Sequence, residues 1–473
     1  MALSHPTIEG AIIQFADTLT QIEASIEGEN LLEYNIPDLL LFIAGKVGNH
    51  STSVIGKVFR LLKKLSSFKA GSEQIIESDG VSIISRLILF HNEDPQTLLF
   101  GSQILASLAQ VERTKTSISN TAMPCLIDTV EVIGNMDDEV YSSCIAQLFS
   151  TLSVFALCTD ANKILISSSS IPNVSKIILE RFNNAHILGA CASMIANVSY
   201  KRPNAAHYLL TSGIVSALIK ACAEKLSIGV HDNELEKVMI AIANVSNSQE
   251  NSSLMYSIDG TVDFTVRLLQ QSDKVSVIRS AANACITMSW DCNAARRHFC
   301  HAVAIEVLMD VILRMGMYDE TKEDKEESKA AEAATCALII LAMDITTLQR
   351  FEENVQDFQA LIELYLQTDS RNVLLSGSMF VSVLLPSTNA KRIFVSEGRR
   401  SFIENQGGGR IIERCMNEVF FCDEALCPPW FLQSISILNK EHDKTKEYNC
   451  SNGVEFLNQS GFYECIEPAS LIE

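Results

Sequence analysis

The cysteine and histidine side chains of one short segment carry the donor atoms that zinc binds. The segment CNAARRHFCH contains Cys292, His298, Cys300 and His301. A structural zinc site needs four ligands around one point, and no second pair follows at a usable spacing. The segment also falls where the repeat described below predicts a helix, which would scatter these side chains around the helix axis. We therefore expect no metal site here.

Other motifs that carry chemistry are also missing. The pair Cys422 and Cys427 has no partner pair, and the three glycines at 407–409 are not followed by the Lys-Ser/Thr of a phosphate-binding loop. The sequence contains no Gly-x-Ser-x-Gly and no His-Glu-x-x-His. We therefore expect no catalytic residue, no cofactor and no enzymatic activity, and the sequence favours a protein that acts by binding.

An apolar helical motif returns along most of the chain. Each copy ends in a short step such as TLSV, NVSY, NVSN or TMSW, with an apolar anchor residue inside it. Successive anchors are 43 to 47 residues apart, with two longer intervals of 53 and 54. Such a period in a helical sequence is typical of a stacked α-solenoid. The anchors are Leu65, Leu108, Leu152, Val198, Val245, Met288, Leu341, Leu384 and Leu438.

Each copy also contains a tight corner before an amphipathic helix. Gly80, Gly213 and Gly260 fit this corner because glycine enters positive φ without strain. Pro124 and Pro172 fit the first helical position, where a missing N–H is not needed. A short helix precedes each corner, so the unit has three helices. The corner, the following Ile-Pro and the closing Asn-Val-Ser resemble the armadillo repeat, which implies an all-α armadillo-type α-solenoid, a right-handed superhelix of three-helix repeats. HEAT repeats usually have two helices without this corner.

The composition restricts the partners. The chain of 473 residues is 47% apolar, has a net charge of −20 and a pI near 4.9. An acidic surface repels phosphate backbones and anionic membranes and attracts basic protein segments. We therefore expect no nucleic-acid binding. Two uncharged windows, 141–159 and 372–390, coincide with third helices of repeats, so we expect no membrane insertion either.

The cysteines indicate the compartment. Fourteen cysteines occur without a Cys-x-x-Cys pair, and Cys144, Cys191, Cys285 and Cys336 fall inside third helices, where they are expected to be small buried residues. This usage fits a reducing compartment, and the first residues do not resemble a signal peptide. We expect a cytoplasmic protein, with the nucleus as a second location.

The breaks in the period define the expected organisation. A polar, charged stretch occupies one long interval, and the other contains the three glycines and the pair Pro428–Pro429. The segments are an N-terminal helical cap at 1–48, armadillo repeats at 49–315, an acidic loop insertion at 316–334, further repeats at 335–400, and an irregular repeat with a cap at 401–473.

The candidate binding residues follow from the armadillo resemblance. In armadillo stacks the third helices line a concave groove, and an Asn before the anchor can bond both N–H and C=O of an extended peptide. Armadillo import receptors add a Trp one turn earlier, and this chain lacks it. The alternatives are amides satisfied on the helix surface and aromatic residues that cap the stack. The expected groove residues are Ser193, Asn197, Tyr200, Asn244, Asn283, Thr287 and Trp290.

The acidic stretch supplies a second set of candidates. One interpretation is a solvated, mobile loop that buries little surface, and the other is a negatively charged segment that attracts a basic partner. Its candidate residues are Asp319, Glu320, Glu323, Asp324, Glu326 and Glu327.

A closer resemblance rests on this region. The acidic insertion is followed by a leucine-rich helix at 336–343 and by Leu348, Gln349, Phe351 and Glu352. Together these resemble the small-GTPase GDP-dissociation stimulator (smgGDS) family. The resemblance implies a non-enzymatic chaperone for Rho- or Rap-like small GTPases with polybasic, prenylated tails. Such a protein grips the GTPase with a concave acidic face and can loosen its guanine nucleotide, and the direction of any effect on guanine nucleotide exchange stays open. This chain is shorter than typical members, and FEENV lacks the glycines expected after Phe-Glu.

The sequence thus predicts a small-GTPase regulator or chaperone as the leading function. The alternative is a scaffold or adaptor that joins cytoskeletal or transport proteins without altering nucleotide exchange. The oligomeric state is not specified by these patterns.

Overall fold

The computed structural model describes residues 35–47, 51–111, 115–134, 139–182, 184–225, 232–316, 325–343, 355–368 and 370–384, with a few isolated residues outside these ranges. In these ranges the regular structure is helical and no strand occurs. The chain forms two compact units, the first ending at Val238 and the second beginning at Met239. The boundary lies within helix α15 (Asp232–Val245).

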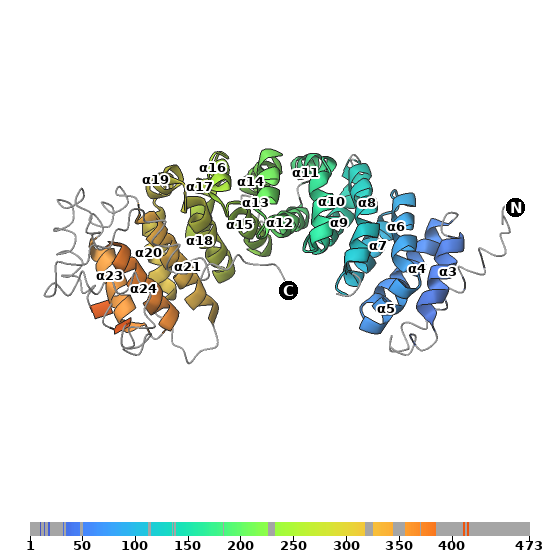
Figure 1. Cartoon of the computed structure of the whole chain (residues 1–473), viewed down its shortest axis with the longest axis horizontal. Coiled ribbons are helices and arrows are strands. Elements are labelled where there is room, and N and C mark those ends of the chain that lie inside the picture. Colours follow the sequence, from blue (N-terminus) through green and yellow to red (C-terminus); the bar gives the residue numbers. More distant parts are fainter. Residues whose placement is uncertain are drawn as a thin grey trace. The chain divides into compact units, whose positions relative to one another are not determined.

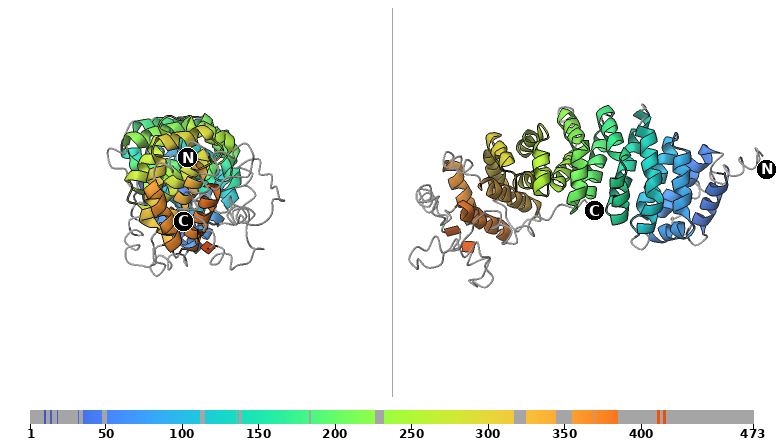
Figure 2. Two further views of the ribbon diagram at one scale, coloured as in Figure 1. Left: turned by 90° about the vertical axis from the view of Figure 1, so that its left-hand side faces the viewer. Right: turned by 45° about the horizontal axis from the view of Figure 1, so that its top comes forward.

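The first unit consists of helices that follow one another in layers (Figures 1 and 2). α4 (Thr52–Ser66), which follows α3 (Ile36–Val47) and contains the anchor Leu65, is the first of the third helices. Each later repeat supplies a short first helix, a second helix and a long third helix, except that the single helix α8 takes the place of the first two. The repeats of this unit are α5 (Lys69–Glu77), α6 (Gly80–Phe90) and α7 (Pro95–Leu108); α8 (Lys115–Gly134), the 3-10 turn η2 (Glu139–Tyr141) and α9 (Ser142–Ala156); α10 (Thr159–Ser167), α11 (Ser170–Arg181) and α12 (Ala185–Ser199); and α13 (Pro203–Thr211), α14 (Ile214–Lys225) and α15.

The second unit repeats the same order. Its third helices contact their neighbours, α18 against α21 and α21 against α24. An aromatic cluster lies between the last two described helices, where Tyr365, Phe358 and Phe380 are fully buried. The helices are α16 (Gln249–Tyr256), α17 (Thr261–Gln271), α18 (Val275–Ser289), α19 (Asn293–His301), α20 (Ala304–Met315), α21 (Lys325–Leu341), α23 (Val355–Gln367) and α24 (Arg371–Leu384).

The periodic anchors form the core of these units. The seven anchors from Leu65 to Leu341 are buried, each exposing at most 2% of its surface. Side-chain caps set where two third helices begin: Asp94 accepts from the Thr97 N–H at the start of α7, and Asn184 accepts from the His186 and Ile187 N–H groups at the start of α12. These caps satisfy amides that have no partner within the first turn.

Left-handed residues make the corners before several second helices. Gly213 and Gly260 have φ of 80° and 77°, as predicted. At the first corner the left-handed residue is Asp79, not Gly80, which is already helical. The corner before α20 holds Val303 at φ 57°. A β-branched residue is strained in this conformation.

Val303→Gly should stabilise the second unit by about 1 kcal/mol, since removing Cβ strain outweighs the extra backbone entropy of glycine. Val303 is 46% exposed, so little burial is lost. Gly260→Val is the matched control, because a Cβ there meets nothing within 4 Å and only the backbone is tested. It should destabilise by a similar amount in denaturant unfolding. A Val303→Gly protein that is less stable than the parent would contradict the strain.

Polar side chains bind the carbonyl groups where third helices end. Asn162 Nδ2 donates to Ala156 O and Val198 O, both at 3.1 Å. Arg202 donates to Asn197 O at 3.0 Å. In the second unit, Arg296 donates to Ser289 O and Trp290 O, both at 2.7 Å. A carbonyl in the last turn of a helix has no N–H group to accept from within that helix, so these side chains act as C-terminal caps.

Two predicted boundaries were wrong. Pro124 lies inside α8, which runs through the expected corner as one helix because no residue there has positive φ. Residues 325–334, expected in the acidic loop, form the first turns of α21. Their run of Lys, Glu and Ala has high helix propensity, and Ala330, Ala331 and Ala334 are buried.

Within the described residues no single helix is both long and apolar enough to cross a membrane. The pair α13–α14 meets the length and composition criteria only as two segments bent by 66°.

Candidate functional site: the third-helix surface

The third helices of the first unit lie side by side and leave one row of side chains open to solvent. α4 contacts α7, α7 contacts α9, and α9 contacts α12 (Figure 1). We call this row the third-helix surface. It is represented by the exposed or half-exposed side chains of Arg60, Lys63, Gln103, Gln147, Ser150 and Ser193.

The charge on this surface is opposite in sign to that of the whole chain. No Asp or Glu occurs within α4, α7, α9 or α12. The helix α4 carries Lys57, Arg60, Lys63 and Lys64, and the other three helices carry neither Lys nor Arg. The acidic concave face implied by the sequence resemblance is therefore wrong for this surface.

Side chains connect neighbouring helices along the row. Lys63 Nζ lies over the ring of Phe100 on α7, 5.9 Å from its centroid. Gln103 Nε2 on α7 donates to Gln147 Oε1 on α9 at 3.4 Å, and Gln147 Nε2 donates to Thr151 Oγ1 at the same distance. These contacts hold basic and amide side chains in fixed positions on the first three helices.

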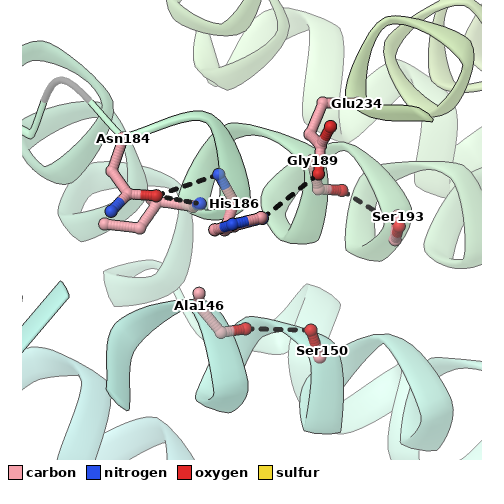
Figure 3. Close-up of polar contacts among 8 residues, drawn as sticks. Ala146, Ser150, Asn184, His186, Gly189, Ser193 and Glu234 are labelled. Atoms are coloured by element: carbon pink, nitrogen blue, oxygen red, sulfur yellow. Dashed lines mark hydrogen bonds and ion pairs between the residues drawn. The ribbon is translucent and has the colours of Figure 1, made fainter. Parts of the chain in front are cut away.

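Small residues occupy the end of the row on α9 and α12. Figure 3 shows Ala146 and Ser150 on α9 and Gly189 and Ser193 on α12. Both serine hydroxyls donate within their own helix, Ser150 Oγ to Ala146 O at 2.9 Å and Ser193 Oγ to Gly189 O at 3.0 Å. Gly189 is buried, whereas Ala146, Ser150 and Ser193 are half-exposed, so these three small side chains leave room for an added chain.

An acidic residue packs beyond this end. Glu234, in the first turn of α15, is buried, and its Oε1 lies 3.2 Å from Nδ1 of the exposed His186 (Figure 3). A Cβ on Gly189 would meet Glu234 Cγ at 2.7 Å, so glycine makes room for this carboxylate. The pair joins α12 to the start of α15.

Three of the predicted groove residues are buried. Asn197 and Asn244 each expose 4% of their surface and Trp290 exposes 7%. Asn197 Nδ2 donates to Ser153 O at 3.1 Å and Ser153 Oγ at 2.9 Å, so it ties α12 to α9. Their assignment as partner contacts was wrong, because their side chains are buried; for Asn197 the adjacent third helix α9 covers the face on which it lies.

The other predicted groove residues are half-buried. Ser193 belongs to the third-helix surface, and Tyr200 follows the end of α12, where Lys201 lies over its ring. Asn283 and Thr287 lie on α18 in the second unit, where Thr287 Oγ1 donates to Asn283 O at 3.2 Å. Partner contacts by these residues stay predictions.

The predicted acidic set is divided by the start of α21. Asp319, Glu320, Glu323 and Asp324 lie outside the described residues. Glu326 and Glu327 are in the first turn of α21, where negative charge is favourable. Glu326 is paired twice, with Arg279 on α18 at 2.5 Å and with Lys329 at 2.8 Å. The Glu326 carboxylate therefore connects the third helices α18 and α21.

These partners should make the stability of the second unit depend on pH. The hydrogen bond from Lys329, and then the charges of Arg279 and Lys329, hold the pKa of Glu326 below its usual value. Its stabilising effect is therefore full above the unfolded pKa of about 4.3 and is lost as pH falls through the lower folded pKa. Because its side chain is 49% exposed, we expect Glu326→Gln to cost less than about 1 kcal/mol at pH 7.

The measurement is the difference in unfolding free energy between the parent and Glu326→Gln as pH is lowered. The difference should vanish below the folded pKa. Glu327→Gln is the control, because among the described residues the ion pairs with Arg279 and Lys329 are made by Glu326 and not by Glu327. A difference that grows on acidification would contradict the assignment.

The cysteines of the third helices are buried, as predicted. Cys144, Cys191, Cys285 and Cys336 are all free thiols in the interior. Burial raises the pKa of Cys191 to about 12, and burial followed by the charge of Asp94 raises that of Cys144 to about 11. Within the described residues no group of three or more His, Cys, Asp or Glu side chains is arranged to hold a metal ion.

Sequence reasoning missed the residues that distinguish the third-helix surface. Arg60, Lys63, Gln103 and Gln147 were not singled out, although their helices were. The signal that could have found them is charge counted helix by helix, since α4 is the one third helix of the first unit with four basic residues.

A comparison with one known structure supports the fold. An engineered protein of known crystal structure aligns with a TM-score of 0.61 at 17% identity, covering 90% of this chain and 98% of that protein. A second engineered protein and a designed armadillo repeat protein align over 54% of this chain, each with a TM-score of 0.43, at 17% and 18% identity. No protein-family model and no curated protein sequence matches the chain.

The three-helix repeats and their stacking define the class of protein. The chain is an all-α, armadillo-type α-solenoid, as the sequence predicted. Each unit presents a surface of third helices, and this type of fold is suited to holding other macromolecules.

Proposed function

We propose that this chain is a non-enzymatic binding protein that holds an extended segment of a partner on the third-helix surface of the first unit. The observation that carries this proposal is the row itself. Four neighbouring third helices carry no acidic residue in a chain of net charge −20, and small side chains at α9 and α12 leave room for a second chain. If a partner were attracted only by the negative net charge of the chain, a surface without acidic residues would not be required.

The test places bulk on the surface. Ser150→Arg with Ser193→Arg should abolish capture of partners from lysate of the source cells, because two long side chains would fill the space above α9 and α12. Ser216→Arg is the matched control, since Ser216 is exposed on the second helix α14. Mass spectrometry compares the captured proteins. Partners retained equally by all three proteins would refute the proposed surface, provided that circular dichroism shows unchanged helix content.

The more specific proposal is that the partners are Rho- or Rap-like small GTPases with polybasic tails. It rests on the sequence resemblance and on the acidic stretch at 316–334. Because α4, α7, α9 and α12 carry no acidic residue, we propose that a polybasic tail meets the acidic stretch of the second unit. Surface attraction of this kind weakens with salt, largely through the association rate.

The GTPase proposal is tested by nucleotide release from a prenylated GTPase. The parent should accelerate release, and replacing Asp319, Glu320, Glu323 and Asp324 with amides should reduce both affinity and its salt dependence. Glu326 is left unchanged in this variant because it is paired with Arg279 and Lys329. Unchanged release with intact binding would favour the alternative, an adaptor without effect on exchange. Affinity that is insensitive to salt and to these substitutions would count against a basic partner.

A further inference from the structure

The basic side chains of the third-helix surface are gathered at one end. Arg60 and Lys63 are exposed on α4, and Lys57 and Lys64 are half-exposed on the same helix. The next three helices offer amides, hydroxyls and small apolar groups and carry no Lys, Arg, Asp or Glu. The surface is therefore positive at α4 and uncharged from α7 to α12.

The length of the row sets the length of a ligand. Packed helices are about 8–10 Å apart, so the three steps from α4 to α12 cover about 25–30 Å. An extended chain advances about 3.3 Å per residue and would cross the row with about nine residues. About three of them would lie near α4.

The amide pair lies where such a chain would pass. Gln103 and Gln147 bond to each other between α7 and α9. Gln103 Oε1 is buried, so the atoms that can exchange the mutual hydrogen bond for bonds to an extended backbone are the donor Gln103 Nε2 and the acceptor Gln147 Oε1. The small residues Ser150 and Ser193 then leave room for the rest of the chain.

From this arrangement, and resting on the proposed function, we infer that the first unit selects an extended protein segment of about nine residues that is acidic at one end and uncharged over the rest. Its carboxylates pair with Arg60 and Lys63, and its uncharged part lies over α7, α9 and α12. The guanidinium of Arg60 supports two-pronged binding of a carboxylate. A nucleic acid fits this surface poorly, because its charge continues along its whole length whereas the charge of the row is confined to α4.

The experiment selects ligands from random peptides displayed on phage, with the whole chain as bait. We expect enriched peptides with Asp or Glu clustered at one end. Binding of a labelled enriched peptide, measured by fluorescence anisotropy, should weaken by about tenfold or more with Arg60→Glu and Lys63→Glu and should weaken with salt. Arg86→Glu with Lys220→Glu is the matched control, because both residues are exposed on second helices of the same unit, and it should change affinity by less than about twofold. Arg60→Gln with Lys63→Gln should reduce the peptide affinity by an intermediate amount, and this variant replaces the charge-reversed one if the reversed charges impair folding.

The other outcomes separate this inference from the proposed function. Enriched peptides that are basic or uncharged, that bind the α4 variant as well as the parent, but that lose affinity with Ser150→Arg and Ser193→Arg would overturn the acidic specificity alone. Acidic peptides that are indifferent to the α4 variant would overturn it too, as would their displacement by an equal concentration of a single-stranded oligonucleotide. If no peptide is enriched, or if the enriched peptides ignore both pairs of third-helix substitutions, the inference and the proposed surface both fail.

Discussion

Arg296→Met should destabilise the second unit by about 3 kcal/mol. Arg296 is only 7% exposed, and its guanidinium donates to Ser289 O, Trp290 O and Asn293 Oδ1. Methionine keeps most of the side-chain length but removes every donor. The buried carbonyl groups of Ser289 and Trp290 would then each lose this donor, and each such loss costs about 1–3 kcal/mol. The effect should appear as faster amide hydrogen exchange in α18 and α19 and as a lower unfolding midpoint.

The neighbouring residue provides the control for this change. Arg297 is exposed on α19, and Arg297→Met removes the same charge at the next position. We expect it to cost less than about 0.5 kcal/mol, as is usual for surface substitutions. Equal effects of the two substitutions would mean that net charge, not the capping of α18, determines the loss.

Asn162→Ala should destabilise the first unit by about 2 kcal/mol. Asn162 is almost completely buried on α10, and its Nδ2 joins the end of α9 to the end of α12 by bonds to Ala156 O and Val198 O. Alanine leaves both acceptors with one donor fewer and opens a small void. Denaturant unfolding of the whole chain, with hydrogen exchange to locate the change, measures the loss.

Lys163→Ala is the adjacent control for Asn162. Lys163 is exposed and makes an ion pair with Asp160 one turn earlier on the same helix, which contributes at most about 0.5 kcal/mol. Two equally small losses would show that the carbonyl groups of Ala156 and Val198 are served by other donors when Asn162 is removed.

The repeat could be predicted from sequence because its signal is physical and recurs. An anchor such as Leu152 or Val245 must be apolar in every copy, since it is fully buried. The cysteines of third helices followed the same logic. The corner was less predictable, because Val303 adopts a left-handed conformation that its residue type disfavours, and because α8 continues through its expected corner.

The site was harder to predict because a third helix in a stack has neighbours on several sides. The helical period places Asn197 beside its anchor but cannot say that α9 covers that face. The capping residues Asn162, Arg202 and Arg296 stand at different distances from the preceding anchors, so no fixed spacing reveals them. The basic residues of α4 are present in the sequence, but the net charge of −20 was considered for the whole chain and not helix by helix, so their clustering was overlooked.

The buried thiols of the third helices can be used to measure local unfolding of the layers that contain them. The thiolate is the form that reacts with alkylating reagents, and burial keeps the pKa of Cys144 near 11 and that of Cys191 near 12. Each thiol can therefore be labelled only while its helix is transiently exposed, so its labelling rate measures the free energy of local opening at that layer. Cys144 and Cys191 report on α9 and α12, and Cys285 and Cys336 on α18 and α21. A partner that clamps one layer would slow alkylation of that cysteine alone, and mass spectrometry would then read the position of the bound segment without any engineered label.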